Sequence, residues 1–262
     1  QDKGWDVTIT DVTEDYTTIG IWGPNARENL KKVVEDPEAL NVENFPFAAI
    51  RQIKIAGKTV SAFRISYVGE QGWELHMRYE DGLVVWDALR GIGVLAVGVE
   101  TYANSRRLEK SLRLQNADLH TQYNLLEADL ARPKVKEADF RGKAKHVEYR
   151  ERDHQPAMLC TLIMTDNVDA NGVARYPVGR LPVMDPETGK TLIDELGRRS
   201  YTTSIAFGPS VGKNIALAYL PWDYCQEGRK LTVSYMDEIY PVEVYGIGYK
   251  PIYDPENLKP RS

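Results

Sequence analysis

The sequence has little cysteine and no long hydrophobic run. Its 262 residues include only two cysteines, Cys160 and Cys225, which lie far apart in the chain. Two cysteines cannot form the disulfide framework of a small secreted domain, so we expect a reducing compartment (the cytoplasm or a mitochondrial matrix) and leave a single cross-link open. No apolar run approaches the roughly 20 residues that span a bilayer, and the N-terminus has no signal-peptide core, so no membrane partner is expected.

The chain also lacks an excess of positive charge and the signatures of common enzymes. Its formal net charge of −5 argues against a general nucleic-acid partner, although it is compatible with a local basic pocket for a small anion. It contains no Walker loop, GxGxxG, GxSxG, HExxH or CxxC pair. The four histidines are scattered without metal-ligand spacing, so no metal site is expected. His76 alternates along a predicted strand, which favours a packing or surface role, and both cysteines are expected to be buried or inert thiols.

The composition that is present is typical of a folded protein. Hydrophobic residues make up 42% of the chain and charged residues 27%, which excludes a disordered chain. The length suits one large domain or two to three small ones. Because the sequence begins at Gln1 rather than methionine, we expect a processed product or a fragment of a longer chain.

The first 153 residues mix strand and helix patterns, which predicts an α+β fold with antiparallel pairing. Runs rich in β-branched and aromatic residues predict strands at 6–10, 16–22, 50–55, 59–66 and 73–79. Apolar stripes predict helices at 25–35, 83–89 and 101–114, with Trp86 and Leu89 on the buried face of the second. Residues 132–149 are charge-rich and predict a loop with a short surface helix.

The composition changes after a boundary that we expect near residues 153–156. Short strand-like runs follow at 158–164, 178–184, 215–220, 231–235 and 241–245, and glycine and proline turns separate several of them. This pattern is typical of a small antiparallel β-barrel or sandwich. We therefore expect two domains, at residues 1–153 and 156–253.

The most unusual segment is SYVGEQGWEL at residues 66–75. Gly69 and Gly72 lie three residues apart between two predicted strands, where a tight turn lets a ligand approach the backbone. Glu70 and Glu74 accompany two aromatic residues of the segment, Tyr67 and Trp73. A carboxylate that accepts paired N–H donors beside a ring can hold a flat 2-amino heterocycle, but the spacing alone favours a bulged hairpin with solvated acids.

This segment resembles the YTGE-x-G-x-E signature of the glycine-cleavage T-protein (aminomethyltransferase) superfamily. Other segments resemble motifs of the same family in the same order, and together they cover nearly the whole chain. They lie at residues 11–13, 23–27, 44–48, 102–110, 126–128, 139–143, 210–221 and 253–257. The resemblance is closest to the folate-binding C-terminal region of the dimethylglycine and sarcosine dehydrogenases.

The resemblance implies T-protein-like modules around a pocket for tetrahydrofolate, followed by a small C-terminal antiparallel β-barrel. By position in the motifs, Glu74 would bind the pterin and Tyr67 would line the same pocket. Asn104 stands where the T-proteins have an arginine that faces folate, and dehydrogenase-type members tend to have asparagine there. Tyr253 falls near a C-terminal tyrosine that touches folate.

The same resemblance implies transfer of a one-carbon unit to tetrahydrofolate from a small methylated amine, an aminomethyl group, or a methyl ether or thioether. The family's catalytic aspartate precedes the segment that begins at Asp11, so the catalytic acid is not assigned among Asp2, Asp6 and Asp11. We therefore expect a larger chain or complex with a flavin-dependent oxidoreductase module or subunit. The alternative is a folate-binding accessory module or scaffold subunit without transfer chemistry.

One charged cluster in the predicted helix at 101–114 is expected to be structural. Arg107 and Glu109 lie within one helical turn of Arg106 and Lys110. A mixed run of this kind is typical of a solvated face or a local ion-pair network. Their substitution is therefore expected to lower thermal stability only slightly.

Overall fold

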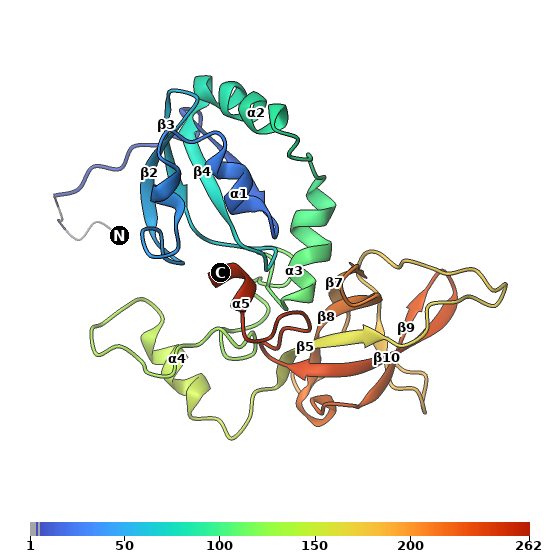
Figure 1. Cartoon of the computed structure of the whole chain (residues 1–262). Helices are drawn as coiled ribbons and strands as arrows, with labels where there is room; N and C mark the ends of the chain where they lie inside the picture. Colours follow the sequence, from blue (N-terminus) through green and yellow to red (C-terminus); the bar gives the residue numbers. More distant parts are fainter. Residues whose placement is uncertain (1–3, 5) are drawn as a thin grey trace. The chain divides into compact units, whose positions relative to one another are not determined.

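The computed structural model describes Gly4 and residues 6–262, and within this range the chain forms two compact units (Figure 1). Unit 1 comprises residues up to Ala96 together with Asn257–Ser262, and unit 2 comprises Val97–Glu256. Both contain helices and an antiparallel sheet, which confirms the α+β class. No helix in the described part of the chain is long and apolar enough to cross a membrane.

A four-stranded antiparallel sheet forms the centre of unit 1, with the strand order β1-β4-β3-β2. Its strands are β1 (Tyr16–Trp22), β2 (Ile50–Ile55), β3 (Lys58–Phe63) and β4 (Gly72–Arg78). The β2–β3 hairpin is confirmed: Ile55 pairs with Lys58 across Ala56 and Gly57, whose φ angles are 48° and 77°. Two residues with positive φ give a turn whose twist matches that of the flanking strands.

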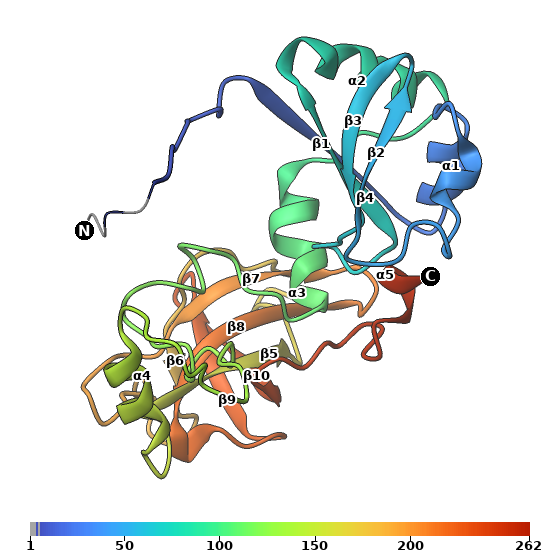
Figure 2. The ribbon, with the colours of Figure 1, turned by 90° about the vertical axis from the view of Figure 1, so that its left-hand side faces the viewer.

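Two helices, α1 (Ala26–Lys31) and α2 (Gly82–Gly91), flank the sheet of unit 1 (Figure 2). Their buried residues join the core cluster that contains the buried side chains of β4, which are Trp73, Leu75 and Met77. Because side chains alternate along a strand, the residues between these three point to the other face of the sheet. The helices therefore cover one face and leave the other face of β4 to Glu74 and His76.

The prediction for the buried face of α2 is half right. Leu89 is buried, as expected, but the side chain of Trp86 is 41% exposed. The core-facing stripe of α2 instead runs through Val85 and Leu89, which are four residues apart and stack on one side of a helix. Trp86 follows Val85 directly, so its side chain points about 100° further around the helix axis and faces outward.

The C-terminal residues belong to unit 1 because two arginines hold them. Helix α5 (Leu258–Arg261) is followed by Ser262, whose backbone oxygen accepts hydrogen bonds from Arg27 Nη2 at 2.7 Å and from Arg64 Nη2 at 2.5 Å. Burial and the nearby charge of Arg27 lower the pKa of Arg64 to about 10. Two short 3-10 helices, η1 (Pro37–Leu40) and η2 (Tyr79–Asp81), complete this unit.

The strand predicted at residues 6–10 is wrong. This segment has no regular structure, and its apolar side chains are open, with Val7 66% and Ile9 93% exposed. A β-branched run forms a strand only when a neighbouring strand satisfies its backbone groups. Strand β1 is an edge of its sheet and pairs only with β4 among the described strands, so the segment has no such neighbour there.

Unit 2 contains the barrel expected from the sequence. Its six strands pair antiparallel in the order β6-β9-β10-β5-β8-β7. The strands are β5 (Ala157–Met164), β6 (Val183–Met184), β7 (Thr202–Gly208), β8 (Lys213–Pro221), β9 (Lys230–Tyr235) and β10 (Glu238–Ile247). An antiparallel bridge between Pro182 and Tyr201 joins the segments that lead into the two edge strands, β6 and β7. The strand predicted at 178–184 shortens to β6, and β7 was not predicted.

The helices of unit 2 are short: η3 (Thr101–Arg106, a π-helix), α3 (Arg107–Glu109), α4 (Lys143–Arg150) and η4 (Trp222–Tyr224). The helix predicted at 101–114 ends near Lys110, because Ser111 has a left-handed φ of 54° that stops helical hydrogen bonding. The surface helix predicted within 132–149 is confirmed as α4. Residues 97–156 form one compact unit with the strands that follow them.

Candidate functional site

The SYVGEQGWEL segment forms the turn into β4, and steric constraints explain why glycine occupies positions 69 and 72. Gly69 has a left-handed φ of 76°, which glycine adopts without a Cβ penalty. At Gly72 a Cβ atom would lie only 2.1 Å from the backbone oxygen of Ile21. The absence of a side chain therefore lets the start of β4 approach the end of β1 closely. This approach fixes the register of the residues that follow.

That register puts Glu74 on the face of the sheet opposite the helices. Glu74 lies directly across from Gly20 of β1 and Phe63 of β3. The ring of Trp22 occupies the space in which a Gly20 side chain would lie, since a Cβ there would be 2.0 Å from two ring atoms. The indole Nε1 of Trp22 donates to the Ile65 backbone oxygen at 3.0 Å, which fixes the ring. The Glu74 side chain is 22% exposed, and both neighbouring strands carry aromatic residues, Trp22 and Phe63.

His76 extends this face by one position. Its ring packs on Phe63 with centroids 4.3 Å apart, and its Nδ1 lies 2.9 Å from Thr18 Oγ1, contacts that agree with the predicted packing role. Its Nε2 lies 3.4 Å from Glu74 Oε2 but has no hydrogen-bond partner among the described residues. Ser66 Oγ is also buried and has no hydrogen-bond partner among the described residues. Buried polar atoms are normally paired, so these two atoms are exceptions among the described residues.

The structure corrects the expected neighbours of this carboxylate. Trp73 is fully buried on the opposite face of β4, where it packs edge-on against Phe45 with centroids 6.0 Å apart. Trp22, which the sequence analysis did not select, supplies the ring on the Glu74 face. Tyr67 is half-buried in the turn before β4. Glu70 is not on a strand; its carboxylate lies 3.9 Å from Lys259 Nζ.

The other two predicted residues lie in unit 2, at a separate cluster. Asn104 is in the π-helix η3, where its Nδ2 donates to Glu100 Oε2 at 2.7 Å. π-Helical turns are rare and often occur at functional sites. The ring of Tyr253 lies under the guanidinium of Arg106 at 5.1 Å, and the backbone N–H of Tyr253 donates to the backbone oxygen of Glu109 at 3.0 Å. Unit 2 thus brings Tyr253 to the helical segment that carries Asn104.

Of the two interpretations of the charged cluster in this segment, the solvated face is wrong. Arg107 and Glu109 are both fully buried. Arg107 Nη1 donates to Asp118 Oδ2 at 2.5 Å, and Glu109 accepts from Arg106 Nη1 at 2.5 Å and from the Ser210 N–H at 2.6 Å. The alternative prediction, a local ion-pair network, is confirmed.

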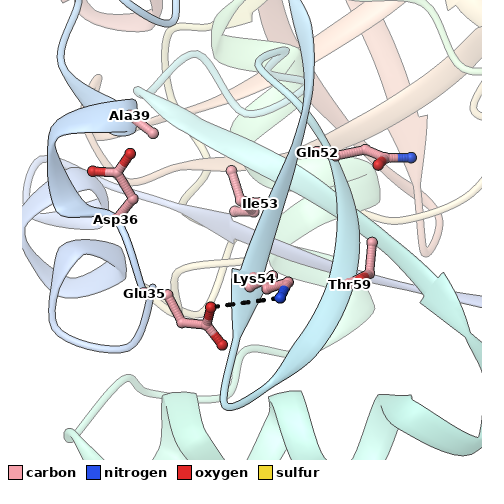
Figure 3. A pocket seen from close by; sticks show the side chains of 7 residues that line it. All are labelled: Glu35, Asp36, Ala39, Gln52, Ile53, Lys54 and Thr59. Atoms are coloured by element: carbon pink, nitrogen blue, oxygen red, sulfur yellow. Dashed lines mark ion pairs between the residues drawn. The ribbon is translucent and has the colours of Figure 1, made fainter.

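A separate cavity in unit 1 contains none of the predicted residues. It measures about 360 Å³ and is lined by Glu35, Asp36, Ala39, Gln52, Ile53, Lys54 and Thr59 (Figure 3). Glu35 and Lys54 form an ion pair in its lining, with 3.9 Å between Oε2 and Nζ. In the described part of the chain no group of three or more potential ligands is arranged to hold a metal ion. Asp6 and Asp11 lie in the irregular N-terminal segment, and Asp2 lies outside the described residues.

The two units define an α+β protein with an antiparallel C-terminal barrel. The family model of the GCVT N-terminal domain matches residues 1–135, and that of the glycine cleavage T-protein C-terminal barrel domain matches residues 181–254. The chain therefore belongs to the glycine cleavage T-protein family, which confirms the resemblance seen in its motifs.

Individual relatives are similar over most of this chain but are longer. Dimethylglycine dehydrogenase, mitochondrial, from Homo sapiens is 32% identical over 247 residues, which are 92% of this chain and 26% of that protein. Aminomethyltransferase from Listeria welshimeri is 31% identical over 233 residues, 87% of this chain and 58% of that protein. The crystal structure of glycine cleavage system aminomethyltransferase T from Bartonella henselae aligns with a TM-score of 0.62 at 16% identity, covering 92% of this chain and 85% of that one, a likeness of fold.

Proposed function

We propose that this chain is the folate-binding part of an enzyme that transfers a one-carbon unit to tetrahydrofolate. Membership of the glycine cleavage T-protein family supports this reaction class. The observation that carries the proposal is the face of β4 that bears Glu74. The Trp22 ring occupies the space beside Gly20, which pairs with Glu74 across the sheet, and His76 Nε2 lies 3.4 Å from the Glu74 carboxylate.

The residues of this face fit the pterin end of tetrahydrofolate. A pterin is flat and presents adjacent N–H donors at its amino edge, and a carboxylate accepts such a pair in a charge-assisted bidentate contact. In the proposal Glu74 accepts these donors, while Tyr67 and the fixed Trp22 ring provide surfaces for the flat ring system. Bound tetrahydrofolate would supply the nitrogen atoms that accept the one-carbon unit.

Asn104 and Tyr253 remain proposed folate-binding residues of unit 2. Asn104 is neutral and held by Glu100, so it would orient the ligand by hydrogen bonding without adding charge. A cation–π contact with the guanidinium of Arg106 holds the ring of Tyr253 in place. The catalytic acid stays unassigned. The proposed domains remain a folate-binding region at residues 1–153 and a barrel at 156–253.

The proposed donor is a small methylated amine, with a methyl ether or thioether as the other chemical class. A relative named dimethylglycine dehydrogenase supports the amine, and it also supports association with a flavin-dependent oxidoreductase module, as part of one chain or as a subunit. The chain spans 26% of that relative and 58% of the aminomethyltransferase, which agrees with a larger protein or complex. A reducing compartment, the cytoplasm or mitochondrial matrix, is part of the same proposal.

The test is equilibrium binding of tetrahydrofolate to the intact protein, followed by single-turnover transfer from N-methylated amines. Saturable binding and appearance of one-carbon-substituted folate are expected. Binding without transfer from any donor class would instead support an accessory folate-binding module. A protein that binds no reduced folate would be a scaffold, and the proposal would be wrong.

A further inference from the structure

The only two cysteines of the chain meet inside the barrel, although 65 residues separate them in sequence. Cys160 is fully buried on β5, and Cys225 is half-buried in the turn after η4. Their sulfur atoms are 3.9 Å apart and both thiols are free. A disulfide needs a separation of about 2.05 Å, so an approach of roughly 2 Å would join them.

The surroundings of the two thiols differ in a way that suits stepwise oxidation. Contact with Cys160 lowers the pKa of the Cys225 thiol, whereas contact with Cys225 and burial raise the pKa of Cys160. The more acidic thiol is thus also the more exposed one. A partly exposed thiolate is the form that reacts with oxidants, and an adjacent second thiol is the arrangement that resolves the product as a disulfide.

The backbone around Cys225 can supply the movement that the bond requires. Cys225 lies in a turn rather than in a strand, and its Sγ is within 3.3 Å of the Pro221 oxygen and 3.4 Å of the Leu220 oxygen. Cys160 is held in the paired strand β5, opposite Ala218 of β8. The turn is therefore the part that shifts, while the barrel strands keep their pairing.

We propose that Cys160 and Cys225 are a modification site, a dithiol that a hydroperoxide converts to an intramolecular disulfide. The Cys225 thiolate attacks one peroxide oxygen, the O–O bond breaks, and a sulfenic acid and the corresponding alcohol or water form. Cys160 then attacks the Cys225 sulfur and expels the hydroxyl group as water. With hydrogen peroxide the sum is two thiols plus one peroxide giving one disulfide plus two waters, and a small dithiol reverses it by exchange.

The cross-link would tie β5 to the turn that leads into β9. It closes a long loop of the chain, and a link of this span restricts the unfolded state strongly. We expect the oxidised protein to melt about 5–10 °C higher than the reduced protein, allowing for some strain in the bond. This comparison uses one sequence in two redox states, so it does not depend on whether a variant folds.

The experiment treats the intact native protein with hydrogen peroxide, blocks remaining thiols, and digests it with trypsin without reductant. The expected product joins residues 153–175, which contain Cys160, to residues 214–229, which contain Cys225. The linked peptide should disappear after dithiothreitol, and the melting temperature should return to that of the reduced protein. The variant Cys160→Ala should instead accumulate a sulfenic acid at Cys225 that a 1,3-dione probe captures.

Three outcomes would overturn the proposal. One is that both peptides stay unlinked while the thiols remain titratable after peroxide. Another is that the link forms only when peroxide is added in denaturant, which would show that the folded barrel prevents it. The third is irreversible over-oxidation of Cys225 in the parent protein at the same rate as in Cys160→Ala, because a functioning resolving thiol would protect it.

Discussion

Arg107 and Asp118 form an ion pair in which neither side chain has any exposed surface, with 2.5 Å between Nη1 and Oδ2. The pair is embedded in further hydrogen bonds: Arg107 Nη2 donates to Ser204 Oγ, and Asp118 Oδ1 accepts from the hydroxyls of Thr203 and Ser204. Burying two charges is costly, and it is tolerated where every remaining polar atom finds a partner. The network joins the segment after η3 to strand β7 within unit 2.

Because the pair is buried, breaking it should destabilise the protein strongly, rather than only slightly as expected from the sequence. Arg107→Met removes one charge and leaves Asp118 buried without its partner, which we expect to lower the free energy of unfolding by about 3–5 kcal/mol. The matched control is Lys145→Ala, whose pair with Glu148 has both side chains more than half exposed and should contribute less than about 1 kcal/mol. Urea unfolding of both variants measures the difference. Equal, small effects would show that Arg107 does not stabilise the fold through this network.

Glu74 is expected to dominate recognition of the pterin. Glu74→Ala should weaken tetrahydrofolate binding about tenfold or more, since ligand donors would lose a charged partner, a loss of roughly 1.5–3 kcal/mol. Glu74→Gln keeps the shape but not the charge and should recover part of the loss. Glu70→Gln is the control, because Glu70 is off the strand and near Lys259. If Glu74→Ala binds reduced folate as tightly as the parent protein, the assignment of this face is wrong.

Much of this fold could be predicted because its signals are local. The hairpin of β2 and β3, the strands β4 and β5, and helix α2 all follow from residue periodicity and turn residues. The segment at 6–10 has the same local signal, but the strand predicted there does not form. Strand formation depends on a neighbouring strand, which no local pattern identifies. Strand β7 was missed although Thr202–Gly208 is rich in β-branched and apolar residues.

The site was harder to predict than the fold, because faces and burial depend on pairing. Periodicity shows that Trp73 and Glu74 point to opposite faces of a strand, but not which face the helices cover. The proximity of Trp22 to Glu74 arises from the β1–β4 register and from the missing side chain at Gly20. In the same way, the burial of Arg107 depends on Asp118 and on strand β7, distant in sequence.

Gly20→Ala tests whether the position of the Trp22 ring matters for binding. The new methyl group would lie 2.0 Å from two ring atoms, so the ring must leave the Glu74 face. We expect tetrahydrofolate affinity to fall about five- to tenfold as a stacking surface is lost, with a change in tryptophan emission. Gly91→Ala is the control, since a Cβ there has no atom within 4 Å. Unchanged affinity together with altered emission would show that Trp22 does not contribute to folate binding.

The acid stability of the barrel should depend on Asp169. Its Oδ1 accepts the N–H groups of Val173 and Asn171 at 2.8 and 2.9 Å, and its Oδ2 accepts from Arg175 Nε at 2.7 Å. These bonds hold the pKa of Asp169 below its ordinary 3.8, although burial opposes the shift. The bond from the Val173 N–H contributes most, and those from Arg175 and Asn171 add to it. These bonds favour the ionised carboxylate in the folded state.

A carboxyl group with a lowered folded-state pKa stabilises the protein above its unfolded pKa and loses that contribution as the pH falls through the folded value. The contribution of Asp169 should thus be complete at neutral pH and disappear below about pH 4. Asp169→Asn should be less stable than the parent at neutral pH, and the two should converge as the pH approaches 2. Urea unfolding across this range measures the convergence, with the exposed Asp223→Asn as the control. A constant difference at every pH would mean that Asp169 acts through packing rather than through its charge.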